Sequence, residues 1–373
     1  MQGGISTAGK QKSMASRKRI RTWRWFLLLA LVVAGVVPVR ADVALLLEEP
    51  YGRFGFINPT GHIAVYLPRV CADSPVHLRR CGPGESGVVI SRYRRVAGYD
   101  WLAVPLIPYL YAVETPEEVP AFVTTGSVAL LRDAYRRNHL RDLIPDGPDG
   151  KMPAGDWVQL VGESYDRKIY GFEIETSEAQ DAQLIQEFNR RPNHAHFNLF
   201  IHNCADLARN LIDLYFPKAV HRSVLADAGI TTPKQVAKSL VTYSRRHPQL
   251  QFSSFVIPQV PGQLHRSYGV HGVAESVVKS KEYVVPLLLL HPYITASLAV
   301  AYAWRGRFNP GHEVTILNSP FELQRQMAFA RPRPHGTQPT PSQKTASAAP
   351  DADPLSKAAL ENVKLASAKG QRE

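Results

Sequence analysis

Residues 197–217 read FNLFIHNCADLARNLIDLYFP, a short apolar run followed by the signal of a helix. Asn203 is a suitable N-cap residue. Cys204, Leu207 and Leu211 then recur at the spacing of one helix face, and the proline that closes the stretch stops the pattern. The spacing predicts a helix that begins at Cys204 and turns this thiol inward from its first turn.

A thiol in this position has expected chemical consequences. The first N–H groups of a helix lack intrahelical partners and carry the positive end of the dipole. They are expected to lower the pKa of Cys204, to favour its thiolate, and to hold the oxyanion of a tetrahedral intermediate. The alternative is that Cys204 is an ordinary buried free cysteine.

The chain has three cysteines, which excludes a disulfide scaffold and a zinc cluster. Cys71 and Cys81 lie ten residues apart in a Gly- and Pro-containing stretch, and they are natural disulfide partners in an oxidising compartment. Their pairing leaves Cys204 as the odd thiol, which favours a reactive role. The opposing possibility is that Cys204 itself pairs with one of them, which would end the hypothesis.

The N-terminus has the order of a secretory signal. Basic residues lie between positions 10 and 24, an apolar run FLLLALVVAGVV follows at 26–37, and Val39 and Ala41 are small residues before Asp42. We therefore expect residues 1–41 to be a cleaved signal peptide. An uncleaved N-terminal anchor is the alternative, and it also places the remainder outside the cytoplasm, in a periplasm or on the outer face of a membrane.

The charge of the chain is concentrated in this leader. The formal net charge of the 373 residues is +12, from 44 basic and 32 acidic residues. Residues 1–41 hold eight basic and no acidic residues, so 36 minus 32 leaves +4 for the rest. A nucleic-acid binder keeps its basic excess in the folded part, so we expect no nucleic-acid partner.

A second apolar stretch lies near the other end. Residues 283–304 read YVVPLLLLHPYITASLAVAYAW, which contains no Asp, Glu, Lys or Arg and has the length of a transmembrane helix. Its prolines weaken that interpretation, and a pair of buried helices or a hairpin is the alternative. We assign residues 42–282 to one domain, 305–330 to a short juxtamembrane segment and 331–373, rich in Pro, Ser, Thr and Ala, to a disordered tail.

Between these ends the patterns alternate between strands and helices, which predicts an α+β domain. Apolar runs bounded by turn residues predict strands, and capping residues predict helices. The strands expected are 61–67, 87–93, 157–161 and 169–174, the helices are 127–142, 177–189 and 232–243, and 101–113 is a loop or edge segment.

His62 opens one of these strands directly after Gly61. A nucleophilic cysteine needs a base, usually histidine. GHIAVY at 61–66, followed far downstream by FNLFIHNCADLAR at 197–209, resembles the circularly permuted NlpC-type papain-like superfamily. This group includes lecithin–retinol acyltransferase-like proteins, permuted thiol peptidases and families similar to bacterial lipoprotein N-acyltransferases. The resemblance covers roughly residues 50–216.

The resemblance implies a permuted papain-like core, in which a small antiparallel sheet packs on the cysteine-bearing helix. It implies that Cys204 is the nucleophile and His62 the general base. The family places a third, polar residue on the following strand, for which His77 and Ser91 are candidates, with His77 the choice. Asn203 is expected to cap the helix beside the oxyanion site.

Two further histidine features stay structural in this interpretation. His202 is close enough to Cys204 to tune its thiolate, but we expect a structural role. His194 and His196 suggest a metal, yet no further ligands follow at a recognisable spacing, so we expect neither metal nor cofactor.

The sequence therefore predicts an exported cysteine enzyme of the cell envelope that forms an acyl-enzyme and passes the acyl group to water or an amine. Amide or ester hydrolysis and lipid-to-amine transfer use the same thioester chemistry, and the expected substrate is a membrane or cell-envelope component. The rival from another class is a non-catalytic envelope binding protein, or a membrane accessory protein, that keeps the fold.

Overall fold

The computed structural model describes residues 41–329 except 95 and 195–196. The predicted signal peptide before Ala41, the predicted tail from 331 and His196 lie outside the described residues.

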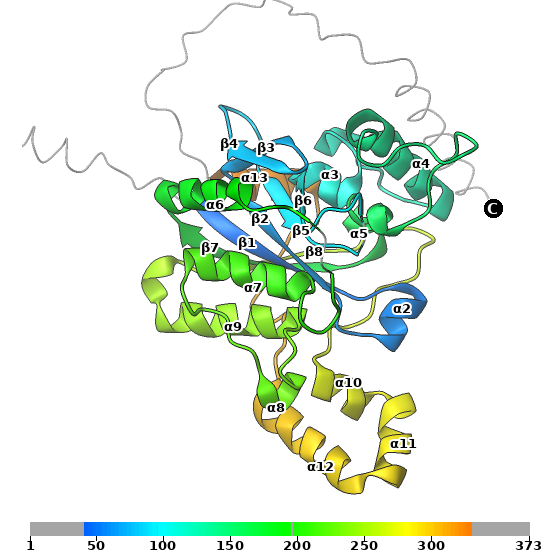
Figure 1. The fold of residues 1–373 in the computed structure, drawn as a ribbon, viewed down its shortest axis with the longest axis vertical. Coiled ribbons are helices and arrows are strands. Elements are labelled where there is room, and N and C mark those ends of the chain that lie inside the picture. The colour runs from blue at the N-terminus through cyan, green and yellow to red at the C-terminus, as the bar shows by residue number, and fades with distance from the viewer. Residues whose placement is uncertain (1–40, 95, 195–196, 330–373) are drawn as a thin grey trace, which may run out of the picture. The chain divides into compact units, whose positions relative to one another are not determined.

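A seven-stranded sheet forms the centre of the fold, with strand order β6-β5-β2-β1-β7-β8-β9 (Figure 1). All neighbours are antiparallel except β8 and β9, which run parallel. The strands are β1 (Ala41–Glu48), β2 (His62–Leu67), β5 (Val88–Ser91), β6 (Leu102–Pro105), β7 (Ile169–Thr176), β8 (Ser253–Ile257) and β9 (Thr315–Ile316). A separate two-stranded sheet holds β3 (Val70–Ser74) and β4 (His77–Arg80). The predicted α+β class and the mostly antiparallel sheet are confirmed.

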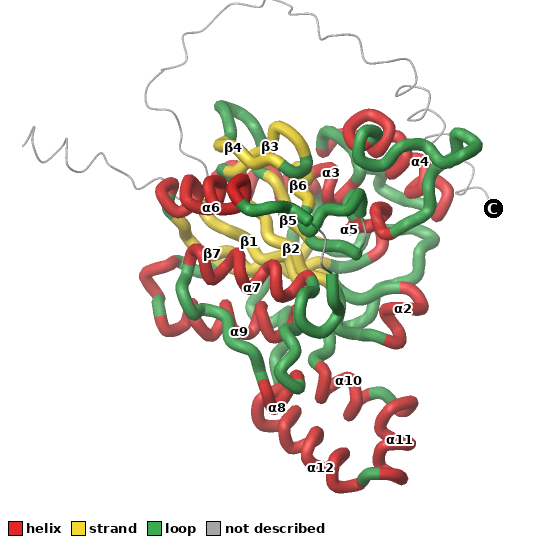
Figure 2. The backbone as a smooth tube through the Cα atoms, viewed as in Figure 1, coloured by secondary structure: helices red, strands yellow, loops and turns green. Residues whose placement is uncertain are grey.

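Helices pack on both faces of the sheet, because alternate strand residues point to opposite sides. Leu45 and Leu47 of β1 share one apolar cluster with α7 and α9, whereas Ala44 and Leu46 join the cluster that contains α3. The first layer holds α6 (Glu178–Arg190), α7 (Cys204–Tyr215) and α9 (Pro233–Arg246), and the second holds α3 (Leu106–Tyr111), α4 (Thr125–Tyr135) and α5 (Glu163–Asp166). Figure 2 shows α7 in front of the strands.

The remaining helices are short. They are α2 (Gly52–Ile57), α8 (Val224–Asp227), α10 (Val273–Lys279), α11 (Lys281–Leu290), α12 (Pro292–Ala301) and α13 (Pro320–Phe329). Single turns of 3₁₀-helix lie at Pro116–Glu118, Asp156–Gln159 and Pro248–Leu250, and π-turns lie at Arg136–Leu140 and Tyr302–Gly306.

The predicted capping residues begin α6 and α9 in the structure. The Ser177 hydroxyl accepts from the Gln180 amide at 3.3 Å and begins α6, and the Thr232 hydroxyl accepts from the Gln235 amide at 3.2 Å and begins α9. The strand expected at 157–161 is wrong, since Asp156–Gln159 is a 3₁₀-turn with Trp157 buried. The segment 101–113 forms the edge strand β6 and then α3.

The stretch 283–304 is not one helix. It is divided into α11 and α12 at His291, because Pro292 has no amide to continue the hydrogen-bond ladder. Within the part of the chain that the structure describes, no helix has the length and apolar character needed to cross a membrane. Residues 305–330, expected to form a short juxtamembrane segment, contribute β9 and α13, and they bury Leu317 and Leu323 in the core.

Candidate active site

Cys204 is the first residue of α7, and hydrogen bonds to the preceding residue, Asn203, hold the start of this helix. The Asn203 side-chain oxygen accepts from the amides of Ala205 at 2.8 Å and Asp206 at 3.0 Å, which satisfies two orphan donors of the first turn. The buried guanidinium of Arg92, just after β5, donates to the Asn203 carbonyl at 2.9 Å. The helix start is therefore tied to the end of β5.

Asn203 acts as a cap and has no side-chain donor left over. Its amide nitrogen donates to the carbonyls of Leu199 at 2.9 Å and Thr231 at 3.1 Å. The expected oxyanion role therefore does not fall on the Asn203 side chain. Because the cap engages the amides of Ala205 and Asp206, the backbone amide of Cys204 itself is the first-turn donor left to hold an oxyanion.

Gly61 sets the path of the chain into β2. Its φ is +72°, which L side chains rarely adopt, and a Cβ there would lie 2.2 Å from the Glu48 carbonyl oxygen. This requirement explains the Gly-His pair physically, because only glycine allows β2 to enter the sheet against β1 at this point. His62 is then paired in register with Glu48.

The Cys204 sulfur lies beside β2, where the backbone amide of Ile63 donates to it. In a strand the amide points within the sheet plane towards the neighbouring strand. The β2–β5 ladder covers only Val65–Leu67, so it leaves the amide of Ile63 available to the sulfur. Since Ile63 follows His62, the sulfur lies within about 6 Å of the His62 Cα.

The thiol is protonated in this environment. Burial raises the pKa of Cys204 to about 11, which outweighs the amides of Ile63 and Ala205 and the positive charge of Arg92, all of which lower it. Glu48 raises it further. The predicted fall of the Cys204 pKa at the helix N-terminus is therefore wrong. Burial destabilises the thiolate by more than the two backbone amides stabilise it.

The His62 ring lies on the opposite side of β2 from α7. It shares a face with Ala64, and it stacks on Tyr93 with the ring centroids 4.3 Å apart. Burial lowers the pKa of His62 well below its usual 6.5, and Arg167 lowers it further. Within the described residues its Nε2 atom is buried without a hydrogen-bond partner, so it makes no hydrogen bond to the thiol. The lowered pKa of His62 and the raised pKa of Cys204 keep both groups neutral.

A buried charged cluster lies under this ring. The Tyr109 hydroxyl donates to Glu48 Oε1 at 2.5 Å and lies 3.2 Å from the hydroxyl of Tyr93. Arg167 reaches Glu48 at 3.2 Å and Glu163 at 2.8 Å. Burial raises the pKa of both carboxyl groups, and Arg167 opposes this.

This cluster is not among the residues predicted from the sequence. Glu48 and Glu49 directly follow the apolar run of β1, and carboxylates at the end of a buried strand were an available signal. Glu163 begins the short helix α5 and Arg167 directly follows it, and this segment has no apolar periodicity that would mark either residue.

The two candidates for a third catalytic residue lie in different places. His77 is exposed on β4, in the separate sheet, with its Nδ1 atom 3.3 Å from Asp73, so the structure does not bring it to His62. Ser91 is buried on β5, and among the described residues its hydroxyl has no hydrogen-bond partner. His202 lies 3.3 Å from Asp100, whose carboxylate also binds Arg92 at 2.5 Å.

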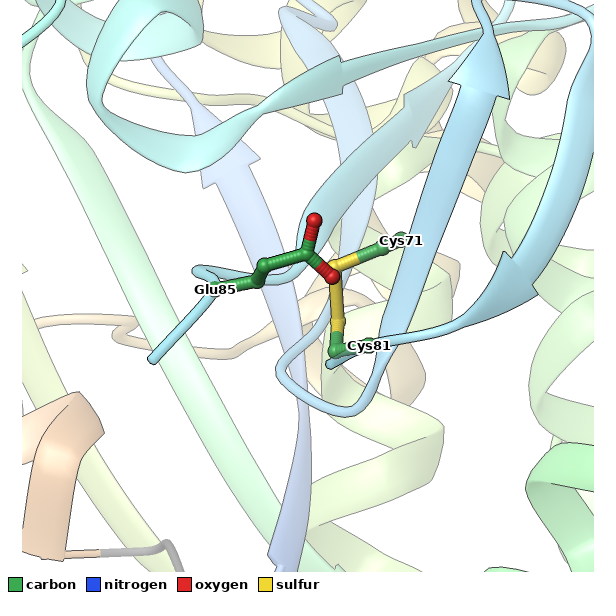
Figure 3. Close-up of side chains that lie close together, drawn as sticks. All are labelled: Cys71, Cys81 and Glu85. Atoms are coloured by element: carbon green, nitrogen blue, oxygen red, sulfur yellow. A yellow bond between two sulfur atoms is a disulfide. The ribbon is translucent and has the colours of Figure 1, made fainter. Parts of the chain in front are cut away.

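Cys71 and Cys81 form a disulfide, with a Cα–Cα distance of 4.8 Å, and Cys204 is the free cysteine. Figure 3 shows the Glu85 carboxylate beside the two sulfurs. This group cannot act as a thiolate metal site, because the sulfurs are bonded to each other. Glu85 is held instead by Arg79 at 2.6 Å, which lowers its pKa to about 2.

A pocket of about 300 Å³ also lies in this region rather than at Cys204. Its charges are matched, since Arg69 pairs with Asp181 at 2.5 Å and Arg80 with Glu178 at 3.4 Å. It therefore offers no excess charge to attract an ionic ligand.

Comparisons with protein-family models, with curated proteins and with solved structures found no match for this chain. The assignment of function therefore depends on the site itself.

Proposed function

We propose that this protein is an exported cysteine acyl-transfer enzyme of the cell envelope, built on a permuted papain-like core. The observation that carries the proposal is the contact between the Cys204 sulfur and the Ile63 amide, one residue from His62. Cys204 is not part of a disulfide, and among the described residues the Nε2 atom of His62 has no hydrogen-bond partner. The Cys71–Cys81 disulfide supports export, because such bonds persist in oxidising compartments.

The reaction starts from the neutral pair. The sulfur attacks an acyl carbonyl while its proton passes to His62 Nε2, and the oxyanion that forms accepts from the Cys204 amide. The carbon–leaving-group bond then breaks, His62 returns the proton to the leaving group, and a thioester remains. Water or an amine attacks the thioester, gives its proton to His62, and releases the sulfur, which recovers that proton.

For this transfer the His62 ring must leave Tyr93 and reach around the start of β2 to the sulfur, because the two side chains lie on different faces of the strand. A buried imidazole nitrogen without a partner costs roughly 1–3 kcal/mol, so a new hydrogen bond to the thiol offsets the lost stacking. The lowered pKa of His62 keeps the imidazole unprotonated at neutral pH, and it also makes the imidazole a weaker base than a free histidine. The substrate class that we propose is an amide or ester of the envelope, a lipid or a cell-wall peptide.

A non-catalytic envelope binding protein is the second candidate, and two specific observations favour it. The Cys204 thiol is protonated at neutral pH, and the His62 ring stacks on Tyr93 instead of contacting the sulfur. In this alternative Cys204 fills space between α7 and β2.

Trapping of the acyl-enzyme separates the two candidates. Wild-type protein, Cys204→Ser and His62→Gln are incubated with a p-nitrophenyl acyl ester at pH 7, quenched in acid and measured by intact mass. We expect one hydroxylamine-labile acyl group on Cys204 in the wild type, none in Cys204→Ser, and at least about a hundredfold slower acylation in His62→Gln. Wild-type protein that stays unmodified would support the binding protein instead.

A further inference from the structure

Helices α11 and α12 have apolar surfaces that nothing in the described chain covers. We call residues 281–301 the helical arm; Figure 1 shows it as a pair of helices below α10. No residue of α11 is buried, and in α12 only Thr295 is. Large apolar side chains are exposed along both helices: Val285, Leu288, Leu289, Leu290, Tyr293, Ile294 and Val300. A helix of a water-soluble domain buries one apolar stripe and turns a polar face outward, and neither helix has that face.

The charged residues of this region lie at the base of the helical arm. Residues 283–304 contain no Asp, Glu, Lys or Arg. Lys279, Lys281 and Glu282 precede them in the sequence, and Arg305 and Arg307 follow. Lys279 is paired with Glu275 at 2.7 Å, so four basic and two acidic residues flank the apolar stretch. This arrangement of a cationic base and an apolar end matches a layer of anionic headgroups above hydrocarbon.

Two hydroxyl groups of the helical arm donate to the arm's own backbone. The Thr295 hydroxyl donates to the His291 carbonyl at 3.2 Å, and the Ser297 hydroxyl donates to the Tyr293 carbonyl at 2.8 Å. At the bend, the His291 amide donates to the Leu287 carbonyl at 2.7 Å, and proline follows without an amide. Hydrocarbon offers no hydrogen bonds, so polar groups that enter it need such internal partners.

Hydrogen bonds hold the start of the helical arm and the helix that precedes it. The Tyr283 hydroxyl donates to the Ile57 carbonyl of α2 at 2.7 Å, and the Val273 amide at the start of α10 donates to Asp227 of α8 at 2.9 Å. Helix α2 adds exposed apolar side chains at Phe54 and Phe56. Each arm helix has ten residues and a length of about 15 Å, which is half of a hydrocarbon core of about 30 Å.

We propose that the helical arm inserts into one leaflet of a bilayer that contains anionic phospholipid. A protein groove would cover one face of each helix and leave the other face in water, whereas lipid surrounds both. The arm spans half of the bilayer, with its cationic base at the headgroups. The inference uses no step of the thiol chemistry, so it can fail without affecting the assignment of Cys204.

Hydrogen exchange on the full chain tests this locally, so binding through the N-terminal apolar run does not confuse the result. Exchange is compared with and without vesicles of phosphatidylglycerol and phosphatidylcholine, and with vesicles of phosphatidylcholine alone. We expect peptides from 283–301 to exchange about tenfold or more slowly with the anionic vesicles, less so with the neutral ones, and peptides from α4 to be unchanged.

Matched variants complete the test. Leu288→Glu places a charge on the arm at a side chain that is 53% exposed, and Leu130→Glu does the same on α4 at 51%. We expect Leu288→Glu to abolish the protection and Leu130→Glu to preserve it, with β1 protected equally in both. Unchanged exchange of 283–301 on vesicles would overturn the proposal. Protection without vesicles that rises with protein concentration would assign the arm to a second copy and overturn it as well.

Discussion

The reactivity of Cys204 gives a quantitative test of its environment. With a pKa of about 11, roughly 0.1% of the thiol is ionised at pH 8, against about 24% for an ordinary cysteine of pKa about 8.5. The thiolate of the weaker acid is about tenfold more nucleophilic. We therefore expect Cys204 to react with dithiodipyridine roughly 20-fold more slowly than an unfolded thiol at pH 8.

The assay is simple because Cys204 is the free cysteine and the other two are bonded. Pyridinethione release is followed between pH 6 and pH 10, in native buffer and in guanidinium. We expect the native rate to rise about tenfold per pH unit over the whole range, and the denatured rate to level off near pH 8.5. A native rate equal to the denatured rate at pH 8 would refute this description of the thiol.

Three further predictions concern stability, each measured as the free energy of unfolding in urea. Gly61→Ala should destabilise the fold by roughly 2–4 kcal/mol through its positive φ and the contact with the Glu48 carbonyl, whereas Gly84→Ala, with φ +82° and nothing within 4 Å, should cost no more than about 1 kcal/mol; equal losses would mean that the close approach is irrelevant. Asn203→Ala should cost about 1–2 kcal/mol through loss of the α7 cap, and an unchanged midpoint would contradict the capping role. Arg167→Met should cost about 3 kcal/mol at pH 7 because it leaves two buried carboxylates unpaired. The defect should shrink as the pH falls towards 5, because the folded pKa values of these carboxyls are raised and protonation removes their charge; a defect independent of pH would show that they are already neutral.

Local signals in the sequence predicted the elements on which the site is built. Asn203 and the spacing of Cys204, Leu207 and Leu211 located α7, because caps and a 3.6-residue period are properties of the segment itself. Ser177 and Thr232 located α6 and α9 in the same way.

What the sequence did not predict depends on contacts between distant segments. β1 is a continuous apolar run directly after the predicted leader, and without alternation it gave no strand signal, although it is the central partner of both β2 and β7. The lowered pKa predicted for Cys204 is wrong, because the sequence shows the helix start but not the burial of the thiol beside Ile63. His77 was chosen by chain order, and only the strand pairing shows that it belongs to the other sheet.

Residues 283–304 show the limit of composition as evidence. Their length and lack of charge predicted one spanning helix, while His291 and Pro292 divide them into two. A single spanning helix and a pair of short helices would expose the same apolar side chains. Pro292 determines that the pair forms.

The central claim is that His62 activates a neutral Cys204 thiol as a general base. It is tested most directly by the pH dependence of the acylation rate with a p-nitrophenyl ester. We predict a wild-type rate that is flat from pH 6.5 to pH 9 and falls only below the lowered pKa of His62, and a His62→Gln rate that climbs about tenfold per unit with the free thiolate. A wild-type rate that climbs in step with His62→Gln over the whole range would contradict the claim.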